Sequence, residues 1–118
     1  MRWMTGLLAA ALLLSATLAA ASTLTPLVRR HSVTIYASAT TSQWCRQRVR
    51  LLWKARDPVL FHEPKRLHRL MQAVANRLHI ECPQARVAVI RGVDAADGVT
   101  AYRGKATRGH HWRLKSVP

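Results

Sequence analysis

The chain has 118 residues, of which 49% are hydrophobic, and it carries 19 lysines and arginines against 5 acidic residues. This length is that of one small domain and argues against two. The apolar fraction is too high for a disordered basic tail, and two cysteines are too few for a scaffold held mainly by disulfides. We therefore expect a folded protein. Its formal net charge of +14 predicts an electrostatic field that attracts anions.

Residues 1–21 have the layout of a cleaved secretory signal peptide. The first six residues carry one positive charge, on Arg2, and residues 7–21 are leucine and alanine apart from Ser15 and Thr17, ending in three alanines. An uncleaved anchor is the alternative, but this stretch is shorter than the ~20 apolar residues that span a bilayer. We expect an exported protein, periplasmic or secreted and of bacterial origin. Its mature chain would have no transmembrane segment and, without Arg2, a net charge of +13.

The two cysteines, Cys45 and Cys82, are expected to form a disulfide bond. An exported chain folds in an oxidising compartment, where paired cysteines are the rule. A thiol–disulfide enzyme would hold its two cysteines close together as C-x-x-C, so the wide separation here favours a structural bond. Two buried free thiols are the alternative.

The chain after residue 21 begins with an extended segment, a strand and a helix. Residues 22–31 show no periodicity and are expected to be an extended lead-in to a single domain over residues 32–118. Residues 32–37 alternate as a short strand does. A first helix is expected over residues 41–56, because Thr40 and Gln43 resemble a capping box and Asp57, before a proline, would end it. Its apolar positions recur at helical spacing: Cys45, Val49, Leu52 and Trp53.

The clearest predicted element is a second helix from Pro64 to about Glu81. Pro64 suits the first helical position, and apolar residues then recur every three or four positions: Leu67, Leu70, Met71, Val74 and Leu78. The short connection between the two helices predicts an antiparallel hairpin. Trp44 and Leu51 fall off the main apolar face of the first helix, where they would cover a neighbouring strand or form a second contact surface.

The apolar period changes to two after the helices, which predicts a small antiparallel sheet. Strands are expected at residues 86–91, 99–106 and 110–115, separated by turn signals at Asp97-Gly98 and Arg108-Gly109. We therefore expect a two-layer α+β fold in which the helical hairpin packs on a three-stranded β-meander. A fourth strand from residues 32–37 is left open.

The cations fall on two predicted faces. Arg46, Arg50 and Lys54 lie four residues apart and would form one stripe on the first helix. In the last hairpin the cations and His111 have one parity, while Tyr102 and Trp112 have the other. The predicted anion-binding residues are Arg46, Arg50, Lys54, Arg103, Lys105, Arg113 and Lys115. Whether the two faces merge depends on the tertiary structure.

The partner considered is an anionic macromolecule or membrane surface: envelope lipid or glycan, an acidic protein, or a nucleic-acid backbone. Tyr102 and Trp112 lie on the parity opposite the cations, which argues against a stacking platform for bases. The alternative to a specific ligand is a solvated basic surface that reflects arginine- and alanine-rich codon usage. The identity of the anion and the oligomeric state stay open.

Catalytic residues, metal ligands and cofactors are not expected. His68 and His79 would share a helix face but lie about 16 Å apart, too far to bind one ion. The sequence has no H-E-x-x-H, phosphate-binding loop or nucleophile elbow. We expect a non-enzymatic binding module. The alternative is an exported enzyme that cleaves phosphodiesters with His111 among Arg103, Lys105 and Arg113.

Overall fold

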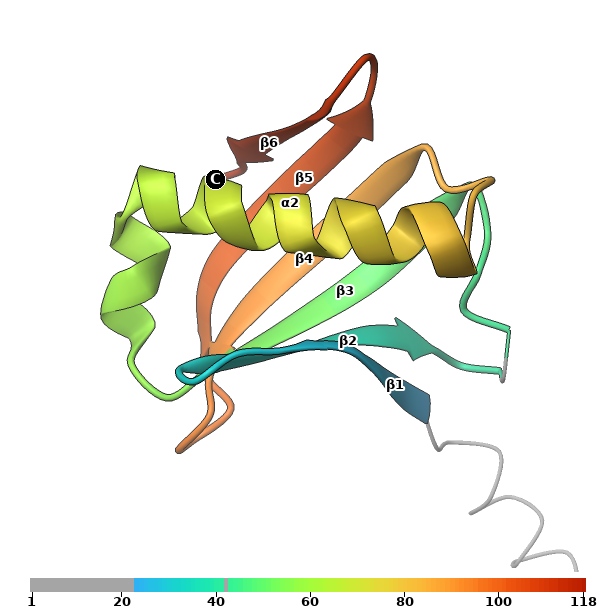
Figure 1. Ribbon diagram of the computed structural model, residues 1–118. Helices are drawn as coiled ribbons and strands as arrows, with labels where there is room; N and C mark the ends of the chain where they lie inside the picture. Colours follow the sequence, from blue (N-terminus) through green and yellow to red (C-terminus); the bar gives the residue numbers. More distant parts are fainter. Residues whose placement is uncertain (1–22, 42) are drawn as a thin grey trace, which may run out of the picture.

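The computed structural model describes residues 23–41 and 43–118, which form a six-stranded sheet with an α-helix across one face (Figure 1). The predicted signal peptide therefore lies outside the described residues. The elements in chain order are β1 (Thr23–Arg29), β2 (Val33–Ala39), β3 (Arg48–Ala55), the 3-10 helix η1 (Pro58–His62), α2 (Pro64–Glu81), β4 (Val87–Asp94), β5 (Thr100–Arg108) and β6 (Trp112–Ser116).

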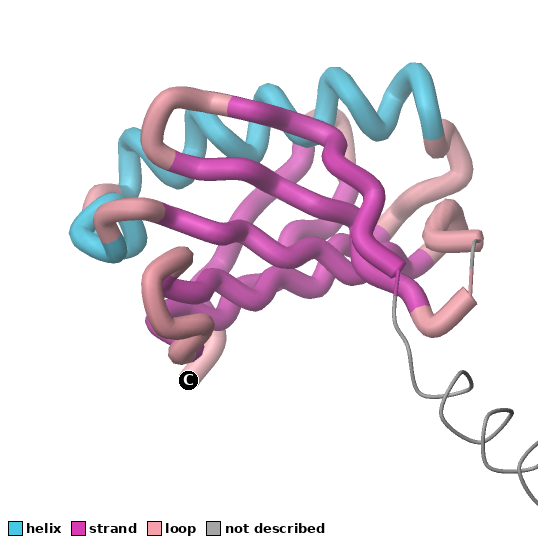
Figure 2. The backbone as a smooth tube through the Cα atoms, turned by 90° about the horizontal axis from the view of Figure 1, so that it is seen from below, coloured by secondary structure: helices cyan, strands magenta, loops and turns pink. Residues whose placement is uncertain are grey.

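The strands lie in the sheet in the same order as in the chain, from β1 to β6. All neighbouring strands are antiparallel except β3 and β4, which are parallel. A parallel pair cannot be joined by a tight turn, because the chain must first return to the end where it started. The α2 helix makes this return and packs on the face that it crosses, as Figure 2 also shows from below.

The predicted first helix is wrong, because residues 48–55 form β3 in the middle of the sheet. Val49, Leu51, Trp53 and Ala55 point toward α2 and are at most 2% exposed. The stretch contains two adjacent leucines and therefore fits a helical period as well as a strand period. Pairing with β2 on one side and β4 on the other favours the strand, since it buries this alternate set completely.

The predicted fold class is corrected accordingly. One α-helix covers a six-stranded mixed sheet, so a helical hairpin on a small antiparallel meander does not form. Residues 23–29, expected as part of an extended lead-in, form β1 at the edge of the sheet. An edge strand tolerates Pro26, because the missing N–H is not needed for pairing on the open side.

Several predicted elements are confirmed. The α2 helix begins at Pro64, ends at Glu81 and buries all five apolar positions that defined it. The strands expected at residues 32–37, 86–91, 99–106 and 110–115 correspond to β2, β4, β5 and β6. Cys45 and Cys82 form a disulfide with a Cα–Cα distance of 5.4 Å. The bond joins the loop before β3 to the C-terminal end of α2 and stabilises by about 4 kcal/mol on the chain-entropy model.

Two aromatic rings close the core beneath the start of α2. Phe61 and Tyr102 stack with their ring centroids 5.4 Å apart. A Cβ atom at Gly92 would meet the ring of Phe61, and one at Gly104 would meet the ring of Tyr102, so both rings lie against glycine backbone. The apolar layer therefore lies on the α2 side of the sheet, and the opposite face carries the remaining side chains.

Candidate anion-binding face

The sheet face opposite α2 is not covered by any described helix (Figure 2). Residues paired across neighbouring strands point to the same face, so the register determines which side chains meet there. The cations with this orientation are Arg29 on β1, Arg48, Arg50 and Lys54 on β3, Arg91 on β4, Arg103 and Lys105 on β5, and Arg113 and Lys115 on β6. We call this set the cationic face. Its members are exposed except for the half-buried Lys54.

Most of the predicted anion-binding residues meet on this face. Arg50 and Lys54 of the expected helical stripe lie beside Arg103, Lys105, Arg113 and Lys115 of the expected hairpin face. A four-residue interval keeps two side chains on one face of a helix and also on one face of a strand. The grouping of Arg50 with Lys54 is therefore right although the element that carries them was wrong.

Arg46 and two neighbouring arginines surround a hollow at one end of the face. Arg46 precedes β3, and with Arg48 and Arg50 it lines a cavity of about 650 Å³ beside the β2–β3 connection. Trp44 also lines this hollow and packs against the core, half-buried. Leu51, the other residue expected on a second contact surface, is instead 2% exposed inside the core.

Four residues of the face were missed from the sequence, and the first of them, Arg29, lies on β1 opposite Thr34. Arg48 lies two positions before Arg50, and Arg91 lies on β4 opposite Arg103; the strand parity of each was the signal that could have identified it. Tyr36 lies on β2 opposite Leu52, and the Nζ of Lys54 sits 5.5 Å from the centre of its ring. The face therefore contains an aromatic ring. This ring was missed from the sequence, because the cations were compared only with the aromatic residues of the last hairpin.

Like charges stand directly opposite one another at the centre of the face. Arg91 pairs with Arg103 across β4 and β5, and Lys105 pairs with Lys115 across β5 and β6. Directly opposed like charges destabilise a sheet. We take the cost per pair as about 0.2–1 kcal/mol, equal in size to the gain from a pair of opposite charges. The native fold maintains this repulsion without a compensating acid on the same face.

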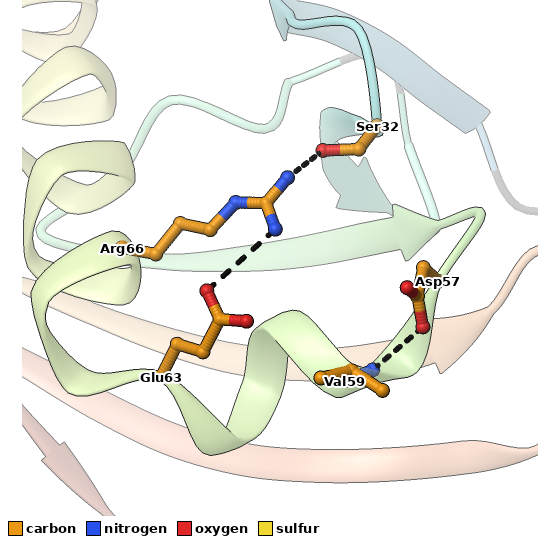
Figure 3. Close-up of polar contacts among 5 residues, drawn as sticks. All are labelled: Ser32, Asp57, Val59, Glu63 and Arg66. Atoms are coloured by element: carbon orange, nitrogen blue, oxygen red, sulfur yellow. Dashed lines mark hydrogen bonds and ion pairs between the residues drawn. The ribbon is translucent and has the colours of Figure 1, made fainter.

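All five acidic residues lie within the described part of the chain, and each has a local partner elsewhere. Figure 3 shows two of them, Asp57 and Glu63, with their partners. The Oδ1 atoms of the three aspartates accept backbone N–H bonds in turns: Asp57 from Val59 at 3.1 Å, Asp94 from Ala96 at 2.9 Å and Asp97 from Val99 at 2.9 Å. The two glutamates pair with arginines of α2: Glu63 with Arg66 at 3.7 Å and Glu81 with Arg77 at 3.1 Å. None of them neutralises the cationic face.

His111 was predicted to lie on the last strand, among the cations of the candidate catalytic cluster. It belongs to the turn between β5 and β6, because β6 begins only at Trp112. With His79 and Arg108 it lines a hollow of about 570 Å³ between this turn and the C-terminal half of α2. The lining of that hollow includes none of Arg103, Lys105 and Arg113.

Metal and membrane features were also sought in residues 23–41 and 43–118. Within these ranges no three histidine, cysteine or acidic side chains are placed to hold a metal ion. No helix among them is long and apolar enough to cross a membrane. Comparisons with models of protein families, with curated proteins and with solved structures find no match to this chain.

Proposed function

We propose that the protein is an exported, non-enzymatic module that binds an anionic macromolecule or membrane surface through the cationic face. Two pairs of directly opposed like charges on a face without an acid carry this proposal: Arg91 with Arg103, and Lys105 with Lys115. A face needed only for solubility could mix both signs of charge and avoid the repulsion. A bound anion would relieve it and would stabilise the folded state by mass action.

The shape of the face supports a ligand that is flat or extended. Neighbouring strands lie about 4.8 Å apart, and successive outward side chains on one strand lie about 7 Å apart. The cations therefore form a two-dimensional array over five strands, which several anionic groups of one polymer or lipid surface can contact together. Arginine adds bidentate hydrogen bonds to phosphate or carboxylate groups.

The disulfide between Cys45 and Cys82 supports export, because such bonds form and persist in oxidising compartments. It agrees with the leader-like composition of residues 1–21. In that location anionic lipid head groups and acidic glycans of the envelope are available ligands. Tyr36 also gives nucleic acid one stacking position beside Lys54, so an oligonucleotide belongs among the probes.

The experiment is a binding titration of residues 22–118 at several salt concentrations. The probes are phosphatidylglycerol vesicles, alginate, polyglutamate and a single-stranded oligonucleotide, with phosphatidylcholine vesicles as the neutral reference. We expect binding to at least one anionic probe, with an affinity that falls steeply as sodium chloride rises, because each contact releases counterions or is screened. The probe that binds best identifies the class of ligand.

A matched pair of double variants separates the face from net charge. Arg103→Ser with Lys105→Ser removes two cations from the cationic face and should weaken binding by tenfold or more. Lys65→Ser with Arg69→Ser removes two exposed cations from α2, on the opposite side of the sheet, and should change binding less than threefold. Equal losses in the two variants, or weak binding that salt does not change, would contradict the proposal and leave the codon-usage explanation.

Phosphodiester cleavage by His111 is the alternative function, and no observation favours it. His111 lines a hollow together with His79 and Arg108, and none of the three cluster cations lines that hollow. His111→Ala should therefore leave salt-dependent binding unchanged. Hydrolysis of an oligonucleotide that disappears in this variant would restore the alternative.

A further inference from the structure

The free side of β6 exposes backbone groups at defined positions. The N–H of Val117 donates to Arg103 at 2.8 Å, and the N–H of Gly109 donates to the carbonyl oxygen of His111 at 3.1 Å. Hydrogen-bonded pairs alternate along an antiparallel ladder, so residues 111, 113, 115 and 117 turn their backbone groups toward β5. The N–H and C=O groups that face outward belong to Trp112, Leu114 and Ser116. No described strand lies beyond β6 to pair with them.

The two edges of the sheet differ in how they resist further pairing. At the β1 edge Pro26 lacks an N–H, and the register shifts between Pro26 and Val28. Proline and bulges of this kind are devices that block strand addition. The β6 edge has neither device, since its five residues pair with β5 without a register shift. Its protection is its short length and the charges of Arg113 and Lys115, which repel a basic strand and attract an acidic one. Of the two edges, β6 is the one that can accept a seventh strand.

On the inner side of β6 the α2 helix leaves space. Trp112 and Leu114 point inward but are only half-buried. Leu114 and Ser116 line a hollow of about 760 Å³ whose apolar walls come from Phe61, Leu67 and Tyr102. Trp112 lines the 570 Å³ hollow that also holds His111. A strand added to β6 would direct every second side chain toward these hollows. The 760 Å³ hollow is the more apolar of the two, although Lys65, His68 and Arg69 also line it, and it would bury apolar side chains.

On the outer side of β6 stand Arg113 and Lys115, two members of the cationic face. The other side chains of an added strand would lie beside them, where opposite charges stabilise a sheet and like charges destabilise it. A second copy of β6 would bring the same two cations and is disfavoured. An acidic strand is favoured, so an acidic segment of another protein fits this edge better than a second copy of β6.

We propose that β6 binds an extended segment of a partner protein by strand addition, and that this segment alternates apolar and acidic residues. Backbone hydrogen bonds from Trp112, Leu114 and Ser116 supply the pairing. The 760 Å³ hollow beside α2 takes apolar side chains, and Arg113 and Lys115 take the acidic ones. This is the edge-strand mode of peptide recognition. It needs the edge of the sheet, whereas the binding proposed above needs only its cationic face.

Hydrogen exchange with a synthetic peptide tests the pairing directly. The probe is a nine-residue peptide that alternates glutamate and valine, capped at both ends, and the control has the same composition in two blocks. In the free protein the amides of Trp112, Leu114 and Ser116 should exchange faster than those of Arg113 and Lys115. The alternating peptide should slow exchange at the three edge amides by at least tenfold, and the block peptide should not. Binding that leaves these amides unprotected would overturn the proposal.

Two variants of one residue isolate the edge hydrogen bond. Ser116→Pro and Ser116→Ala both remove the hydroxyl that lies 3.4 Å from the Tyr102 hydroxyl, but only proline removes the outward N–H. Lys115 is already extended, as a residue before proline prefers, and no β5–β6 bond is lost. The proline variant should bind the alternating peptide at least tenfold more weakly than the alanine variant, with an unchanged circular dichroism spectrum. Equal affinities would overturn the proposal.

Two further measurements separate this site from the cationic face and from self-association. Arg50→Ser with Lys54→Ser removes face cations that lie on β3, away from β6, and should change peptide binding less than threefold. A larger loss would mean that the peptide binds the face as a polyanion, which overturns the edge site and leaves the first proposal standing. Sedimentation should show a monomer, because a dimer broken by Ser116→Pro would make a second copy the occupant.

Discussion

The two faces of the sheet are made by the same strands and obey opposite electrostatic rules. On β3 Val49, Leu51 and Trp53 are buried beneath α2, while the alternate residues carry the cations of the outer face. The inner face gains free energy by removing apolar surface from water. The outer face loses free energy by holding like charges side by side. The contrast teaches that the inward-facing residues of these strands maintain the fold, whereas the outward-facing residues are available to a ligand.

The largest expected effect compares an inner-face residue of β3 with the adjacent outer-face residue of the same strand. Trp53 is fully buried, so Trp53→Ala should lower the free energy of unfolding by about 3–5 kcal/mol through lost burial and a cavity. Leu52 is only half-buried on the outer face, and Leu52→Ala should cost less than about 1 kcal/mol. Urea unfolding of both variants measures the difference. Equal costs would mean that the two faces are not distinct in burial.

A smaller effect is expected where backbone meets an aromatic ring. Gly92→Ala places a methyl group against the ring of Phe61 and the Cβ of Tyr102, and should cost about 1–3 kcal/mol by overpacking. Gly109→Ala is the matched control, because its Cβ would meet only the carbonyl oxygen of His111 at 3.8 Å. Thermal unfolding compares the two. A neutral Gly92→Ala would show that the Phe61 ring moves aside without loss of packing.

The smallest effect has the opposite sign and tests the outer face. Arg103→Thr removes the repulsion with Arg91 and should raise the free energy of unfolding by about 0.2–1 kcal/mol at low salt. The gain should vanish at high salt, because exposed charges are then screened. The same variant should weaken anion binding. A variant that is less stable at low salt would show that Arg103 supports the fold through contacts other than charge.

The sequence predicted local elements well where one interpretation dominated. The five apolar positions of α2 lie every three or four residues from Pro64, and no strand period fits them. The turn at Asp97-Gly98 separates β4 from β5, with Gly98 at a positive φ of 74°. Residues 48–55 were ambiguous, because Leu51 and Leu52 are adjacent and satisfy both periods. Burial between two neighbouring strands resolved that ambiguity, and a single chain segment cannot show its neighbours.

The candidate site was predicted in composition but not in arrangement. Arg50 and Lys54 were grouped correctly for a reason that holds in either secondary structure. Arg91 was overlooked because its importance comes from Arg103 opposite it, on a different strand. His111 was expected on the last strand with the cations, whereas β6 begins only at Trp112. Each of these differences follows from cross-strand register.

The sequence by itself determined the cationic character, the α2 helix, the strand parities of the last hairpin and the pairing of Cys45 with Cys82. These follow from charge, local periodicity and the small number of cysteines, which need no knowledge of distant residues. Only the tertiary structure decided that β3 lies parallel to β4 in the sheet centre, so that the two groups of cations form one face. It also decided which edge stays open. Both depend on long-range pairing, whose free energy comes from burying one face of each strand against segments far away in the chain.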